Sequence, residues 1–264
     1  MTEPVFRREG SLFVPTAHAV GPWDVGQLHG GAPAVLVARA VEALEAPVAM
    51  RTCRITMEFL GAVPAAPLQV QAEVLRGGPR LQLCEATLSS GDGKVLVRAR
   101  AVRLREGDVD LRGRGAQETA TPFAGPETGV APHYPGGAGP EHEGFHLTGM
   151  DIRFLEGAIH LPGPGHAWFR PARPFVDDEP VSPLQRAVAA ADFGNGVSSE
   201  LDWDALFVNT DLTVSLLRPP AGEWVLLDSR TLLDRGGSGV AISRLWDAAG
   251  ELGTAQQTLF VDRR

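Results

Sequence analysis

The sequence has few of the features that mark disulfide-stapled, metal-binding or membrane-spanning proteins. It contains two cysteines, Cys53 and Cys84, too few for a disulfide framework or a zinc ligand set, so we expect two buried thiols. No run approaches the roughly 18 apolar residues of a membrane-spanning helix. The N-terminus, MTEPVFRREGSLFVP, lacks the basic and apolar regions of a signal peptide. We therefore expect a cytoplasmic protein without a membrane span.

The chain is also short of positive charge. It has 24 Lys and Arg against 32 Asp and Glu, a formal net charge of −8. Nucleic acids and anionic membranes are bound by clustered Lys and Arg, so we expect neither as a partner. With 44% hydrophobic and 21% charged residues the composition is that of a folded globular protein. A small molecule is the expected ligand.

One segment near the N-terminus predicts a helix that is apolar on nearly all sides. Residues 26–44 read GQLHGGAPAVLVARAVEAL, with Pro33 suited to a first turn. The charged residues within the run, Arg39 and Glu42, are three apart and share one face. Such a helix must be wrapped by other elements, and it is too short to cross a membrane.

Strands follow this helix. Alternating apolar and polar residues with turn signals between them predict strands at residues 54–60, 68–75, 80–88 and 94–104. Asp92-Gly93 between two such runs is typical of a hairpin. A helix followed by a meander of this kind predicts a curved antiparallel sheet around a central helix.

The same order of elements occurs a second time. Residues 106–143 are rich in Gly, Pro, Thr and Glu and read as a linker between an N-terminal unit, 1–105, and a C-terminal unit, 144–264. The second unit has a predicted helix from Ser182 to Phe193, with Ser as N-cap. Its predicted strands lie at residues 145–154, 165–171, 209–217, 223–233, 239–247 and 253–261.

A constant spacing supports a duplication. Three pairs of equivalent strand residues are 157 positions apart, namely Thr56 and Thr213, Gly93 and Gly250, and Ala101 and Thr258. The fold class expected from the repeat is α+β, with two helix-wrapping sheets in tandem.

Short motifs carry a family resemblance. The segments GQLHGG, FVNTDLTVSLLRPPAGEW and AQQTLFV resemble the acyl-CoA thioesterase II family and its bacterial thioesterase-like relatives, which have a double hotdog fold. The resemblance implies hydrolysis of acyl-CoA to free acid and CoA, without a metal or organic cofactor. We also expect the protein to be a homo-oligomer acting in fatty acid metabolism.

The resemblance also implies a set of site residues. A water would be held by an Asp, a Gln and a hydroxyl residue of the second unit. These fall on Asp211, Gln257 and Thr231, with Ser229 as a competitor for the last position. Gln27, Gly30 and Gly31 would bind substrate at the start of the first helix, where unpaired backbone N–H groups can polarise a carbonyl.

The repeat bears on how many sites the chain holds. At the spacing of 157, Asp211 corresponds to Arg54 and Gln257 to Arg100. The first unit then lacks the polar set, so we expect one active site per chain, built on the second unit and facing the first helix.

Each candidate also has a structural interpretation. Asp211 follows Asn209-Thr210 and could be a turn residue. A one-residue shift of register would exchange Gln257 with Gln256. The glycines could simply allow close packing, and we expect His29 beside them to be packed or solvent-facing.

A zinc site is not expected, although residues 142–146 fit the pattern H-E-x-x-H. That pattern binds zinc on a helix, where residues four apart share a face. Here the context predicts a linker running into a strand, in which the two histidines lie too far apart for one ion.

Two other functions stay open. The same fold could bind acyl ligands without catalysis. It could also hydrate enoyl-CoA, but that reaction needs an Asp and a His near the helix, and the second helix has Asp192 without a His.

Overall fold

A computed structural model describes residues 2–112, 120–134, 142–159, 161–177, 179–201 and 205–263. The first half contains β1 (Phe6–Glu9), β2 (Leu12–Pro15), α1 (Gly31–Glu42), β3 (Met50–Phe59), β4 (Leu68–Arg76), β5 (Leu81–Ser90) and β6 (Val95–Arg105). The second half contains β7 (Met150–Ala158), β8 (Leu161–Pro171), α2 (Pro183–Ala191), α3 (Gly194–Val197), β9 (Ala205–Asn209), β10 (Asp211–Leu216), β11 (Val225–Asp234), β12 (Ser238–Asp247) and β13 (Gly250–Arg263). Short helical turns lie at Ala17–Ala19, Pro126–Thr128 and Phe145–Gly149.

The strands form one sheet whose two halves mirror each other. The order is β1-β2-β4-β5-β6-β3-β10-β13-β12-β11-β8-β7, with β9 added beside β13. At the junction, β3 and β10 pair antiparallel with Thr56 opposite Thr213, and the two hydroxyl groups are 3.2 Å apart. Thr56 and Thr213, which are equivalent in the repeat, therefore meet at the centre of the sheet. The fold is the double hotdog predicted from the sequence.

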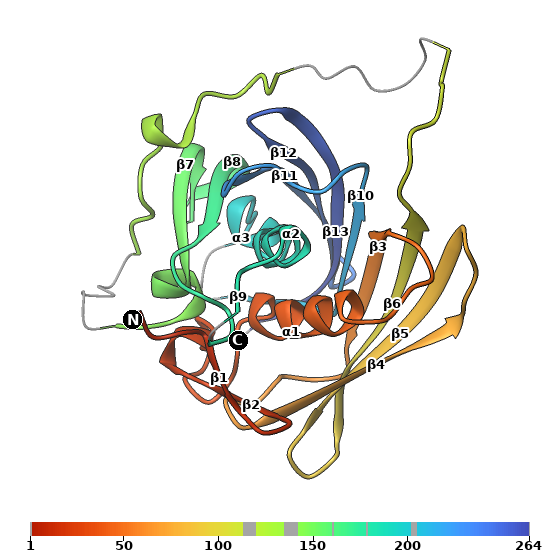
Figure 1. Ribbon diagram of the computed structural model, residues 1–264. Coiled ribbons are helices and arrows are strands. Elements are labelled where there is room, and N and C mark those ends of the chain that lie inside the picture. Colours follow the sequence, from red (N-terminus) through yellow and green to blue (C-terminus); the bar gives the residue numbers. More distant parts are fainter. Residues whose placement is uncertain are drawn as a thin grey trace.

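The two central helices lie side by side inside the curve of the sheet (Figure 1). Seven consecutive residues of α1, Ala32–Ala38, are buried, which explains the apolar circumference of this helix. The helices run in opposite directions, as a contact between their ends shows. Ser182 at the start of α2 donates to Glu42 at the end of α1 over 2.6 Å. The start of α1 is thereby placed against the end of α2.

The start of α2 is fixed by reciprocal capping. Ser182 accepts from the backbone N–H of Gln185, whose side chain accepts from the Ser182 N–H, and Pro183 occupies the first turn. This arrangement sets the position of the whole helix, including its C-terminal cap residue Asp192.

Residues 120–134, between the two halves, lie along the outside of the second half (Figure 1). Phe123 packs there against Trp168 and Trp246, and the Trp168 indole donates to the carbonyl of Ala124 over 2.8 Å. The first strand series ends at Arg105, but residues 113–119 and 135–141 of the expected linker lie outside the described residues. The unit boundaries at 105 and 143 stay predictions.

Some local expectations were wrong. Residues 145–149 form a single helical turn rather than the start of a strand. Strand β3 begins at Met50 instead of residue 54. Thr56 pairs with Arg100, and the equivalent Thr213 pairs with Gln256. In the last strands of the two halves, equivalent residues are therefore one position closer in sequence than the repeat suggested. Gln257 is therefore equivalent to Ala101, and not to Arg100.

Among the described residues, no helix combines the length and apolar character needed to cross a membrane.

Candidate active site

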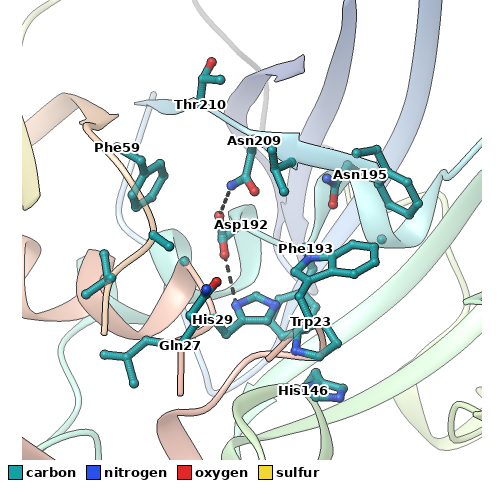
Figure 2. A pocket seen from close by; sticks show the side chains of 18 of the residues that line it. Trp23, Gln27, His29, Phe59, His146, Asp192, Phe193, Asn195, Asn209 and Thr210 are labelled. Carbon is teal, nitrogen blue, oxygen red and sulfur yellow. Dashed lines mark hydrogen bonds and ion pairs between the residues drawn. The ribbon is translucent and has the colours of Figure 1, made fainter. Parts of the chain in front are cut away.

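A cavity of about 310 Å³ lies where the start of α1, the end of α2 and strand β9 meet. Figure 2 shows the side chains that line it. Its apolar wall comes from both halves of the chain and includes Trp23, Phe59, Val63, Ile159, Phe193 and Phe207. A mostly apolar cavity with a few convergent polar groups is the usual form of a small-molecule site.

The polar centre of the cavity is Asp192, whose side chain is 2% exposed. Asn209 at the end of β9 donates its Nδ2 to Asp192 Oδ1 over 2.7 Å. On the other side, Nδ1 of His29 lies 3.0 Å from Asp192 Oδ2. Both contacts are drawn in Figure 2. A buried carboxylate needs such partners, since an unpaired charge inside a protein is very costly.

Gln257 joins this group from β13. Its Nε2 donates to the backbone carbonyl of Asp192 over 3.0 Å and to Oδ1 over 3.2 Å. Its Oε1 accepts from the backbone N–H of Asn195 over 3.1 Å. Gln257 is 1% exposed whereas its neighbour Gln256 faces outward. Gln257 therefore fixes the corner between α2 and α3 on which Asp192 is placed.

Asp211, the carboxylate expected from the sequence, is not part of this group. It is the first residue of β10, and its Oδ1 accepts the backbone N–H of Thr258 over 2.6 Å. The next residue, Leu212, is fully buried. Because neighbouring side chains of a strand point to opposite faces, Asp211 faces away from the helices. Asp211 therefore does not lie beside Gln257 as the resemblance implied, and its strand-entry interpretation is the one that the geometry supports.

Thr231 and Ser229 also lie apart from Asp192. Thr231 is on the inner face of β11, where its hydroxyl is 2.9 Å from that of Ser198. Ser229 is 2.7 Å from Ser243. Thr231 is opposite Ala241 on β12, which is opposite Gln257 on β13. Two strand spacings, about 10 Å, therefore separate Thr231 from Gln257. Asn209 is the polar side chain found beside Asp192 instead.

The start of α1 lies at the cavity as expected. Gln27 and Gly30 line it, and the Gly31 N–H lies 3.1 Å from His29 Nδ1. A Cβ on Gly30 would come 2.8 Å from Asp192 Oδ2, and one on Gly31 would come 2.7 Å from the Phe145 ring. Glycine at these two positions therefore lets the start of α1 approach Asp192 and the Phe145 ring this closely.

Sequence reasoning did not place His29, Asp192 and Asn209 at the cavity. His29 is not simply packed, because it brings a ring nitrogen from the first half to a carboxylate of the second. The second helix indeed has no histidine, but the first half supplies one to Asp192. A usable signal was present in α2, since Asp192 is a charged residue directly after the buried run Ala187–Ala191. No local pattern links it to His29, 163 positions earlier.

Among the described side chains, no group of three or more His, Cys, Asp or Glu is placed to hold a metal ion.

A second cavity of about 310 Å³ occupies the equivalent place at the opposite ends of the helices. Its lining residues Leu216 and Arg218 are 157 positions after Phe59 and Gly61 of the first cavity. There Ala101 stands at the position of Gln257, and the α2 N-terminus is closed by its own capping box. Its charged lining includes Glu42 and Arg103, but the position of Gln257 is taken by an apolar side chain, so we expect one active site per chain.

His146 also lines the first cavity and has an unusual titration. Burial, followed by the nearby His29, lowers the pKa of His146 to about 3. Between that value and the ordinary 6.5 the unfolded chain binds a proton that the folded chain does not. His146 therefore removes stability as the pH falls through this range, by at most about 1.4 kcal/mol per pH unit.

We expect His146→Phe, which keeps an aromatic ring beside Tyr134 and His29, to make stability less dependent on pH between 6 and 4. Urea unfolding at several pH values measures this slope. An equal slope in wild type and His146→Phe would contradict the prediction.

Comparison with known proteins agrees with the fold and identifies a family. Residues 19–104 match the acyl-CoA thioesterase N-terminal domain and residues 119–261 the acyl-CoA thioesterase C-terminal domain. No significant match was found among curated protein sequences.

Solved structures with a similar fold include a hot dog fold protein of unknown function from Alicyclobacillus acidocaldarius, with 16% identity, a TM-score of 0.74 and coverage of 98% of this chain and 96% of that one. Another is the acyl-CoA thioesterase II TesB2 of Mycobacterium marinum, with 18% identity, a TM-score of 0.64 and coverage of 98% and 94%. The tesB protein of Mycobacterium avium subspecies paratuberculosis has 16% identity, a TM-score of 0.66 and coverage of 97% and 96%. At these identities the likeness is one of fold. With both of its halves matched to the two domains, the chain belongs to the acyl-CoA thioesterase family and is a thioester hydrolase.

Proposed function

We propose that the protein hydrolyses acyl-CoA to free acid and CoA in the first cavity, with Asp192 as the base that activates water. The observation that carries the proposal is the placement of this carboxylate. It is almost fully buried, yet it lies on an apolar cavity and is held by side chains from both halves of the chain. A base in this position can act on a bound thioester that the apolar wall shields from bulk water.

The reaction proceeds as a simple addition and elimination. A water molecule gives one proton to Asp192, and its oxygen adds to the thioester carbonyl carbon. The tetrahedral intermediate then collapses with cleavage of the carbon–sulfur bond. The departing thiolate takes the proton back from Asp192, which returns the carboxylate to its starting form. Every proton is accounted for without a cofactor.

The other residues have separate roles in this scheme. Asn209 contacts Asp192 and lines the cavity, so it holds the carboxylate and offers its carbonyl oxygen to the water. Gln257 positions Asp192 through two donated hydrogen bonds. The first turn of α1, at Gly30 and Gly31, supplies backbone N–H groups and the positive end of the helix dipole for the carbonyl oxygen.

Release of free CoA thiol from a series of acyl-CoAs, from acetyl to palmitoyl, tests the proposal. We expect hydrolysis above the uncatalysed rate for at least one chain length. If no acyl-CoA is hydrolysed while one of them still binds in a calorimetric titration, the enzyme proposal fails and a non-catalytic acyl-ligand-binding protein takes its place.

One observation favours a second candidate, the hydration of enoyl-CoA. That reaction needs a carboxylate and a histidine close together, and His29 lies 3.0 Å from Asp192. Crotonyl-CoA separates the two functions, because hydration removes the enoyl absorbance without releasing thiol. Thioester hydrolysis also ends the conjugation of the enoyl thioester, so thiol released in step with the loss of absorbance supports the thioesterase. Loss of absorbance without thiol release supports the hydratase.

Three expectations from the sequence stay predictions, namely a homo-oligomeric state, a cytoplasmic location and a role in fatty acid metabolism.

A further inference from the structure

The position of His29 Nδ1 raises a question about its proton. The nitrogen lies 3.1 Å from the Gly31 N–H and 3.0 Å from Asp192 Oδ2. The first contact requires a lone pair on Nδ1 and the second requires a proton there. A ring nitrogen has either a proton or a lone pair in the ring plane, so only one of the two contacts is a hydrogen bond at a time.

The surroundings keep the ring in this place. His29 is 12% exposed, and its ring packs against Phe193 at 4.4 Å and Phe145 at 5.2 Å between centroids. Of the described titratable groups, Asp192 and His146 face the ring from the neighbouring elements. His146 is uncharged at neutral pH, because burial and then His29 lower its pKa to about 3. Asp192 is therefore the neighbour that decides where the His29 proton lies.

A hydrogen bond to a carboxylate is roughly twice as strong as one between neutral groups. The contact with Asp192 should therefore outweigh the contact with Gly31 and hold the proton on Nδ1. The Gly31 N–H is then left without an acceptor from His29. It belongs to the first turn of α1, whose N–H groups have no partners within the helix.

We propose that His29 is a positioning residue that links the two parts of the reaction. Its Nδ1–H donates to Asp192 and orients the base, and the same proton keeps the Gly31 N–H free for the carbonyl oxygen of the thioester. The other tautomer would lose the contact with the base and occupy the oxyanion donor at once. This inference rests on the proposed function for its consequence, but the tautomer itself is a property of the free protein.

NMR of the protein with ¹⁵N-labelled histidine tests the tautomer directly. The His29 signals are assigned by their loss in His29→Phe. We expect the neutral ring of the wild type to carry its proton on Nδ1. A proton on Nε2 would overturn the proposal, whether or not the protein hydrolyses acyl-CoA.

The variant Asp192→Asn gives a sharper form of the same test. Asn209 and Gln257 both donate to the Oδ1 position, so the new amide places its oxygen there and its NH₂ toward His29. Nδ1 must then accept a hydrogen bond. We expect the His29 proton to move to Nε2 in this variant, and an unchanged tautomer would contradict the proposed control by Asp192.

Kinetics test the consequence. His29→Phe keeps the ring contacts but has no donor, and we expect kcat to fall about tenfold with KM changed less than threefold. His29→Asn places an amide near the position of Nδ1 and should recover most of kcat. If His29→Phe is as active as the wild type, the ring only packs and the positioning role is wrong, although the thioesterase function would stand.

Discussion

Asp192→Asn is expected to lower kcat for acyl-CoA hydrolysis by about 10²–10⁴-fold, the usual value of a positioned general base. The amide cannot take a proton from water. The scaffold around it should persist, because Asn209 and Gln257 can still donate to the amide oxygen. We therefore expect the loss in kcat, with a smaller change in KM. Initial rates of thiol release across substrate concentrations measure both constants.

The matched control is Asp211→Asn, the same change at the carboxylate that faces away from the helices. Its Oδ1 accepts only a backbone N–H from Thr258 among the contacts of the described residues, and an amide oxygen can replace it. We expect kcat within about twofold of the wild type. A large loss of kcat in Asp211→Asn together with an active Asp192→Asn would mean that Asp211, and not Asp192, is the base. The site described above would then be wrong.

The second large effect is expected for Gln257→Leu. Leucine has a similar volume but leaves the Asn195 N–H and the Asp192 carbonyl without their partner. Each buried polar group left unpaired costs about 1–3 kcal/mol. We expect the free energy of unfolding to fall by about that amount or more, and kcat to fall at least tenfold because Asp192 is no longer held. Urea unfolding and thiol release measure the two effects.

Gln256→Leu is the control for this change, one residue earlier on the outer face of β13. Surface substitutions away from special features usually change stability by less than 0.5 kcal/mol. We expect both kcat and the unfolding midpoint to stay near the wild type. Equal effects of the two variants would mean that the face assigned to Gln257 is wrong.

Much of the architecture could be predicted because its signals are local. The apolar circumference of α1 required a wrapping sheet, and the alternation in β4, β5 and β6 identified antiparallel strands with one buried face. The spacing between Thr56 and Thr213 identified the duplication, and the structure places these two residues opposite each other. Boundaries were less certain, since the chain enters β3 before its alternation becomes regular and forms a helical turn at Phe145–Gly149.

The site was predicted only in part. Residues marked by a short motif could be found from the sequence, whereas the surroundings of a strand residue also depend on which face it occupies. Gln257, Gln27 and Gly30 were found because short motifs mark them, and they do lie around one cavity or its carboxylate. Asp211 was chosen from a similar motif, but a strand directs neighbouring side chains to opposite faces, and its register puts Leu212 inside.

The sequence by itself determined two helix-wrapping units in tandem, because the periodicity of apolar residues can be read from each segment of the chain alone. Only the tertiary structure decided which polar groups meet. The antiparallel packing of α1 and α2 brings His29 to Asp192, and the pairing of β13 with its neighbours turns Gln257 inward to the same carboxylate. These contacts join residues 163 and 65 positions apart, and no local pattern encodes a distance of that kind.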